Sequence, residues 1–173
     1  MGGCTRAART ARTLERADRY FKAGDYDKAR TEYLNVLQKD RTNRTAIKQL
    51  GIIWLEEGAP IRALPFLRAA RDLDPNDLNI RTKLASVRLM LGGAEEARKE
   101  ALAILRQSPS EGEALIVLGD STLSKEQADD TEEQLRQIKP PDSANLHLAL
   151  ATLAVRKGDL STAENELQRA LTA

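Results

Sequence analysis

Several residue types are scarce in this 173-residue chain, and each scarcity excludes a class of protein. One cysteine, Cys4, excludes an internal disulfide framework and a cysteine-based zinc site. One histidine, His147, has no second histidine or cysteine near it in the sequence with which to share a metal ion. We therefore expect no metal or other cofactor.

Aromatic residues are also few, and the net charge is small. The chain has one Trp, three Tyr and two Phe, and its formal net charge is +1. Neither a base-stacking platform nor a basic groove is supported, so we expect no nucleic-acid partner. No apolar run approaches the roughly 18 residues that would indicate a membrane span.

Helix-forming residues are abundant, and small residues recur among them with a fixed period. Gly24, Gly58 and Gly92 are spaced 34 residues apart, and Gly158 follows 66 residues after Gly92. An alanine lies five residues beyond each of these glycines. A fixed period carrying the same small residues is typical of a helical repeat array. The alanines are Ala29, Ala63, Ala97 and Ala163.

The period divides the chain after a basic leader, residues 1–9. In each unit, the glycine is expected to end a first helix in the left-handed conformation, and small residues let a second helix pack closely against it. Pro75 and Pro109 are expected to follow the ends of second helices. The units of the array, 10–173, are 10–43, 44–77, 78–111, 112–143 and 144–173.

These positions resemble the tetratricopeptide repeat (TPR) consensus. The second unit carries Gly51, Trp54, Gly58, Ala63 and the run Asp74-Pro75-Asn76 at the expected places. The resemblance implies an all-α fold, a right-handed α-solenoid of about five helical hairpins. It also implies a non-enzymatic scaffold whose concave groove, lined by the first helices, binds a partner protein or an extended peptide.

The resemblance also predicts which residues line this groove. Leu14 and Asp18 replace the lysine and asparagine with which one TPR subfamily holds carboxylate tails, so that activity is not expected. The alternative is that the apolar side chains at the predicted groove positions pack inside the protein. The groove positions are Leu14, Asp18, Phe21, Lys48, Ile52, Leu55, Thr82, Ser86, Leu89, Met90, Ile116, Asp120, Leu123, Leu148, Thr152 and Val155.

The fourth unit departs from the pattern. Lys125-Glu126-Gln127 stands where the glycine is expected, and Thr131 replaces the alanine. We predict helices over 112–124 and 130–138 with a loose turn between them. Ser110 and Glu113 are spaced as a capping box for the first of these helices. In the second unit, Pro65 should bend the helix that contains it.

The N-terminal segment is basic and one-sided. Six basic and two acidic residues lie among the first 22, in a chain with 27 Lys and Arg and 26 Asp and Glu overall. The arginines could face an anionic membrane surface, although a charged helix face is more often simply solvated. They are Arg6, Arg9, Arg12, Arg16 and Arg19.

Gly3-Cys4 followed by polar residues resembles the lipid-attachment site of bacterial lipoproteins. This resemblance implies a lipid on Cys4, with the protein tethered to a membrane and facing the periplasm, as in bacterial TPR lipoproteins. An unmodified thiol and a cytoplasmic location are the alternatives. An N-myristoylation site fits less well, because Arg6 occupies the position of the required Ser or Thr.

Two further features carry expectations. The run that ends in Ser121 resembles a serine-hydrolase block, but alanine at position 144 does not supply the aspartate that this family needs three residues before its histidine. We therefore interpret both Ser121 and His147 as packing residues.

The last helix has an apolar face with no capping helix after it, which predicts either a longer bacterial protein or an end-to-end homodimer. That face carries Leu160, Ala163, Leu167 and Leu171.

Overall fold

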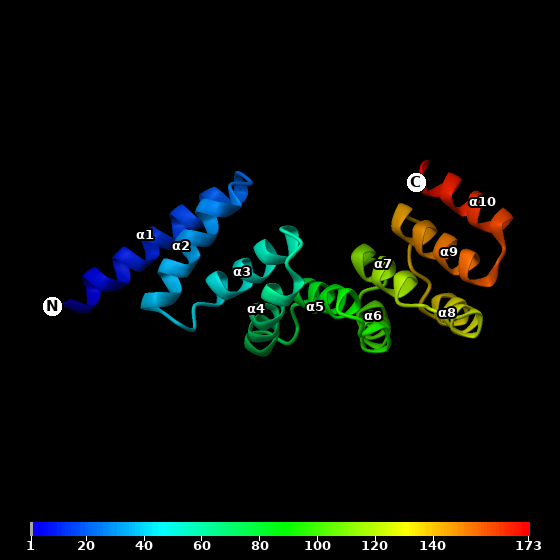
Figure 1. The fold of residues 1–173 in the computed structure, drawn as a ribbon, viewed down its shortest axis with the longest axis horizontal. Helices are drawn as coiled ribbons and strands as arrows, with labels where there is room; N and C mark the ends of the chain where they lie inside the picture. The colour runs from blue at the N-terminus through cyan, green and yellow to red at the C-terminus, as the bar shows by residue number, and fades with distance from the viewer. Residues whose placement is uncertain (1) are drawn as a thin grey trace. The chain divides into compact units, whose positions relative to one another are not determined.

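The computed structural model describes residues 2–173, and side chains from residue 7 onward. The described residues form ten α-helices joined by short turns, with no strand among them (Figure 1). The predicted all-α class of helical hairpins is confirmed. The helices are α1 (Gly2–Lys22), α2 (Tyr26–Lys39), α3 (Arg44–Glu56), α4 (Pro60–Leu73), α5 (Leu78–Met90), α6 (Ala94–Gln107), α7 (Gly112–Asp120), α8 (Lys125–Ile138), α9 (Ala144–Lys157) and α10 (Leu160–Ala170).

The helices are distributed over two compact units, residues 1–83 and 84–173, whose boundary falls inside α5. In the first unit α1 packs against α2, α3 packs against α4, and α2 also contacts α3. In the second unit α9 packs against α10 and also contacts α7 and α8, while α6 contacts α7. Each unit is thus built from helices that pack on their neighbours in the chain, as a repeat array requires.

The recurring glycines end the first helices as predicted. Gly24, Gly58, Gly92 and Gly158 all have positive φ, between 68° and 89°. A side chain is strained in this conformation, which explains why glycine recurs at the turn. The alanine five residues beyond each glycine is buried in the following helix, and Ala29, Ala63 and Ala97 have no exposed surface.

Close packing inside a hairpin is clearest between α3 and α4. A Cβ atom added to Gly51 would lie 2.8 Å from Cδ2 of Leu67 and 3.2 Å from its backbone nitrogen. Leu67 therefore fills the space that a side chain on α3 would occupy. Pro65 lies inside α4, which nevertheless runs without interruption from Pro60 to Leu73.

Polar groups in the core of the first unit are paired. Tyr33 is fully buried, and its hydroxyl donates a hydrogen bond of 2.6 Å to the Asp18 carboxylate. Burial and this bond both raise the pKa of the Tyr33 hydroxyl far above its ordinary value. The core around it consists of Ala17, Ala29, Val36, Ala46, Leu50 and Ile53.

The divergent fourth hairpin corrects two predictions. The helix predicted over 112–124 ends at Asp120, and the one predicted over 130–138 begins five residues earlier, at Lys125. The early start follows from Ser124, whose hydroxyl accepts a hydrogen bond from the backbone of Gln127 and so caps α8. The predicted capping box is wrong, because Glu111 occupies the cap position of α7 and forms no side-chain capping bond.

Thr131, which stands where the other repeats have the buried alanine, belongs to a buried polar network. Its hydroxyl lies 3.1 Å from Nη2 and 3.3 Å from Nε of Arg98, a largely buried arginine on α6. Arg98 also binds Asp130. On the other side, Thr131 lies 3.4 Å from the hydroxyl of Thr122, which donates to the Leu118 carbonyl. Hydrogen bonds therefore hold α6, α7 and α8 together where the other hairpins have a small apolar contact.

Across the described residues, no helix is long and apolar enough to cross a bilayer. Nor do the described side chains include a group of three histidine, cysteine or acidic residues that could hold a metal ion.

Candidate groove between helices α7 and α9

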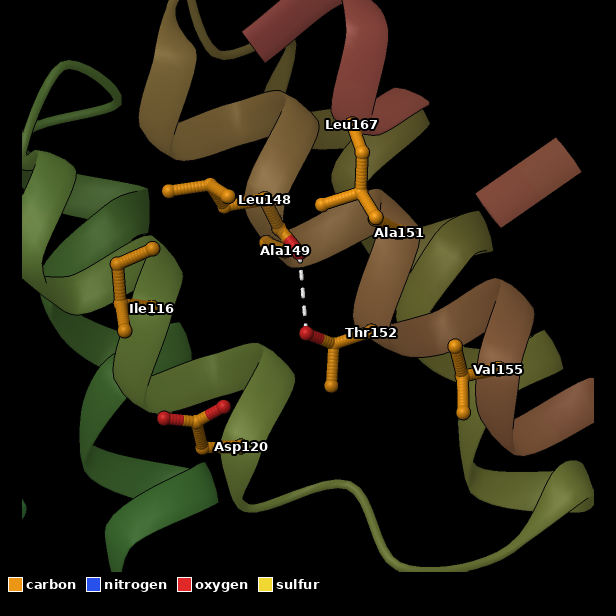
Figure 2. Close-up of a pocket in the computed structure, with 8 residues that line it drawn as sticks. All are labelled: Ile116, Asp120, Leu148, Ala149, Ala151, Thr152, Val155 and Leu167. Carbon is orange, nitrogen blue, oxygen red and sulfur yellow. Dashed lines mark hydrogen bonds between the residues drawn. The ribbon is translucent and has the colours of Figure 1, made fainter. Parts of the chain in front are cut away.

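A surface hollow of about 290 Å³ lies in the second unit, with walls from α7, α9 and α10 (Figure 2). We call it the α7–α9 hollow. Its lining is mostly apolar, with one hydroxyl and one carboxylate. The lining residues are Ile116, Asp120, Leu148, Ala149, Ala151, Thr152, Val155 and Leu167.

Close contact between α7 and α9 sets the base of the hollow. A Cβ atom added to Gly119 would lie 3.1 Å from Cα of Ala149, so the two backbones meet with almost no side chain between them. Ile116 and Asp120 are one turn apart on α7, and Leu148 and Thr152 are one turn apart on α9. Residues at this spacing share a helix face, so both helices present a row of side chains to the hollow.

The apolar lining is only partly covered by the protein itself. Leu148 is 39% exposed, Leu167 47% and Val155 52%, within one continuous surface. The hydroxyl of Thr152 donates to the Leu148 carbonyl at 3.0 Å, so its hydrogen is already used (Figure 2). Contiguous exposed apolar side chains in a hollow are typical of an interaction site.

Polar contacts fix α9 against its neighbours. His147 is buried, with Nδ1 2.6 Å from Glu166 on α10 and Nε2 2.6 Å from Asp142. The Glu166 contact is a hydrogen bond, and the Asp142 carboxylate lies against the other ring nitrogen. At the other end of α9, Lys157 contacts Glu132 and Asp129 of α8, and these hydrogen bonds raise the pKa of its ammonium group. The wall that carries Leu148 and Val155 is therefore held at both ends.

Asp120 is the one charged side chain that lines the hollow. It is exposed, and within the described part of the chain it forms no ion pair and no side-chain hydrogen bond. It is also the last residue of α7, where the helix dipole adds partial negative charge. This rim of the hollow is therefore electronegative.

The structure brings together five of the groove residues predicted from the sequence: Ile116, Asp120, Leu148, Thr152 and Val155. Other predicted members do not line this hollow. Leu123 is 60% exposed in the turn before α8, and Met90 is 61% exposed at the end of α5. Ser86 and Leu89, also on α5, are partly buried.

Predicted groove residues of the first unit have varied surroundings. Lys48 forms an ion pair with Asp77 and lines a separate hollow of about 360 Å³. Ile52 and Leu55 are partly buried on α3. Thr82 is fully buried, with its hydroxyl bonded to the Leu78 carbonyl, so it offers no surface to a partner.

On α1, three of the predicted membrane-facing arginines are exposed: Arg9, Arg12 and Arg19. Arg16 instead forms a bidentate ion pair with Glu32 on α2, at 2.6 and 2.7 Å. This pairing raises the pKa of the Arg16 guanidinium. The side chains of Cys4 and Arg6 lie outside the described residues.

The two residues considered for catalysis both pack inside the second unit. Ser121 is 1% exposed, and its hydroxyl donates to the Leu118 carbonyl at 3.1 Å. His147 is 2% exposed and contacts Asp142 and Glu166, as described above. Both residues have the packing role that their sequence context indicated.

One wall of the hollow was not predicted. Leu167 belongs to the second helix of its hairpin, and the family resemblance places only first-helix residues in the groove. The sequence signal for Leu167 is the apolar face of α10, which by itself predicts only an exposed end surface.

Comparison with known proteins supports the repeat assignment. Two sequence profiles, both described as tetratricopeptide repeat, match residues 14–77 and 54–118. A search of curated proteins found no match.

Solved structures share the fold at low sequence identity. The crystal structure of the MamA protein is 23% identical and covers 94% of this chain and 90% of its own, with a TM-score of 0.72. MamA from Desulfovibrio magneticus RS-1 is 19% identical and covers 94% and 93%, with a TM-score of 0.75. YrrB, described as a TPR protein with an unusual peptide-binding site, is 15% identical and covers 92% of this chain and 84% of its own, with a TM-score of 0.71. With the matching profiles, the paired helices and the glycine-ended turns, the chain belongs to the tetratricopeptide repeat family.

Proposed function

We propose that this protein is a non-enzymatic scaffold that binds an extended segment of a partner protein in the α7–α9 hollow. TPR proteins generally act as protein-interaction scaffolds, and YrrB is described as having an unusual peptide-binding site. One observation carries the proposal for this chain. Predicted groove positions on two successive first helices line one hollow, where Leu148 and Val155 are exposed.

The dimensions and lining of the hollow also favour a peptide over a small molecule. At about 290 Å³ it is at the lower limit of pockets that enclose drug-sized ligands, roughly 300–1,000 Å³. A shallow apolar surface between two helices can instead accept one or two side chains of a chain lying across it.

Affinity capture with matched variants tests this proposal. Wild-type protein, Leu148→Asp and the control Ile61→Asp would be immobilised and exposed to extracts of the source cells. Ile61 is 76% exposed on α4, so the control adds the same charge to an apolar surface elsewhere. We expect a partner that wild type and Ile61→Asp retain and Leu148→Asp loses, with equal helical content by circular dichroism. Equal retention by all three would contradict binding in the hollow.

A second function, attachment to an anionic membrane surface, is favoured by the exposed arginines of α1. Arg9, Arg12 and Arg19 each add attraction of about 1 kcal/mol near such a surface. Sedimentation with phosphatidylserine vesicles should then remove the protein from solution at low salt, and Arg9→Gln with Arg12→Gln should reverse this. No sedimentation of the wild type would contradict the function. Lipid attachment at Cys4 would strengthen it, and mass spectrometry of protein from its native source tests that modification.

Self-association through α10 is the remaining partner proposal. Leu160, the first residue of α10, is 70% exposed, and Leu171, which caps its C-terminal end, is 81% exposed; the same helix supplies Leu167 to the hollow. Analytical ultracentrifugation should show a dimer that Leu171→Glu dissociates. A monomer at all concentrations would contradict the proposal and leave the groove unaffected.

A further inference from the structure

The chemistry of the α7–α9 hollow restricts the peptide that it can accept, given the proposed function on which this inference rests. Its walls combine an aliphatic surface, formed by Ile116, Leu148, Val155 and Leu167, with a single charged group at the rim. An apolar side chain of a partner would cover leucine and valine atoms that now face water, which is the main favourable contribution available here.

The sign of the charge selects the neighbouring residue of the partner. Asp120 is exposed and has no ion-pair partner among the described residues, and no basic side chain lines the hollow. Its place at the C-terminal end of α7 adds the negative end of the helix dipole. A partner carboxylate would be repelled at this rim, whereas a guanidinium or ammonium group would be attracted.

Four other acidic side chains that lie against α9 are already paired with residues of that helix. Glu132 and Asp129 contact Lys157, and Glu166 and Asp142 contact His147. Asp120 has no such partner, and it is the acidic side chain that lines the hollow beside the apolar surface (Figure 2).

We propose that the α7–α9 hollow recognises an extended peptide segment that presents an aliphatic side chain beside an arginine or lysine, with Asp120 receiving the basic group. In an extended chain, residues two apart point to the same side, so the two side chains would stand at positions i and i+2 of the segment. The aliphatic group supplies affinity, and the ion pair supplies discrimination against acidic segments.

A peptide-display selection with a charge-reversal variant tests this proposal. The probe is a library of random twelve-residue peptides, selected in parallel on the wild type, on Asp120→Lys and on Glu164→Lys. Glu164 is exposed on α10 and does not line the hollow, so the control makes the same change of charge in the same unit. Circular dichroism and thermal unfolding establish that all three proteins are folded.

We expect wild type and Glu164→Lys to enrich peptides with an aliphatic residue two positions from arginine or lysine. Asp120→Lys should enrich aspartate or glutamate at that position instead. For one selected basic peptide, Asp120→Asn should weaken binding about fivefold, the size of effect expected from one exposed ion pair. The difference between wild type and this variant should shrink in high salt.

Two other results would overturn the inference, and they differ in what else they contradict. If all three proteins select the same apolar peptides without preference for charge, Asp120 does not choose the partner, although the groove still binds peptides. If the wild type enriches no peptide of any composition, the peptide-binding function fails together with the inference.

Discussion

The second and fourth repeats, α3–α4 and α7–α8, hold their helices in place by different kinds of contact. In α3–α4 a glycine on the first helix accepts a leucine of the second, and a glycine in the left-handed conformation makes the turn. In α7–α8 the turn glycine is absent, α7 ends early at Asp120, and a serine caps the next helix. The buried alanine of the other repeats is replaced by Thr131, which bonds Arg98. A repeat can therefore lose its diagnostic residues while polar contacts to α6 and to the turn after α7 hold its second helix.

The largest effect should come from adding a side chain at Gly51 on α3, where Leu67 of α4 packs. Gly51→Val places atoms where Leu67 already packs, and the nearby Leu67 backbone cannot move away as a side chain can. We expect the free energy of unfolding to fall by about 3 kcal/mol, the upper end for overpacked cores. Urea unfolding measures this change, with Arg68→Ala on the exposed side of α4 as control. A loss below about 1 kcal/mol would mean that the α3–α4 contact is looser than the structure indicates.

The second prediction is that the buried side chains of Thr131 and Arg98 stabilise the protein through each other. Thr131→Ala restores the residue typical of the other hairpins, but it removes a hydrogen-bond partner from the buried Arg98. We expect a loss of about 2 kcal/mol, because an unsatisfied buried donor is costly. Arg98→Met should cost a similar amount. The double variant should cost clearly less than the two changes added together. Additive losses, measured by urea unfolding of all four proteins, would show that the two side chains act independently.

The start of α8 provides a smaller test. Ser124→Ala removes the hydroxyl that accepts the Gln127 backbone hydrogen bond, and it should cost about 1 kcal/mol. Ser110→Ala is the matched control, since Ser110 is exposed and is not the cap of α7. Thermal unfolding of both variants compares them. If Ser110→Ala were the more damaging change, the capping box predicted from the sequence would be right and the cap at Glu111 wrong.

The smallest effects concern two of the left-handed turns, at Gly58 and Lys139. Gly58→Ala introduces a side chain at a φ of 68° and should cost about 1 kcal/mol. Lys139 already adopts a φ of 53° at the end of α8. Lys139→Gly relieves that strain but increases the freedom of the unfolded chain, so we expect a change below about 0.5 kcal/mol. A large stabilisation by Lys139→Gly would show that the divergent hairpin stores strain.

Much of the fold could be predicted, because it depends on local signals that repeat. Glycine at a fixed period specifies where the first helices end, and the structure has Gly24, Gly58, Gly92 and Gly158 in the left-handed conformation. The divergent hairpin was harder, because Ser124 and Thr131 act through partners that are specific to it. Arg98, 33 positions before Thr131, could not be paired with it from the repeat pattern alone.

Whether the predicted positions form a binding groove stays a prediction, but their placement can be compared with the structure. First-helix positions carried over from the family located Ile116, Asp120, Leu148, Thr152 and Val155 at one hollow. The same rule also selected Thr82, which the structure buries, since helix position alone does not determine exposure. It omitted Leu167, because the approach of a second helix to a groove depends on how the helices pack and not on their periodicity.

The most direct test of the account is site-specific photocrosslinking in extracts of the source cells. A benzophenone amino acid would replace Val155, which is 52% exposed in the hollow, and in a second protein Ile61, which is 76% exposed on α4. We predict that the photoreactive group at Val155 crosslinks a partner polypeptide and that unlabelled peptide from the display selection prevents this crosslink. A partner crosslinked equally from Ile61, or from Ile61 alone, would contradict recognition at the α7–α9 hollow.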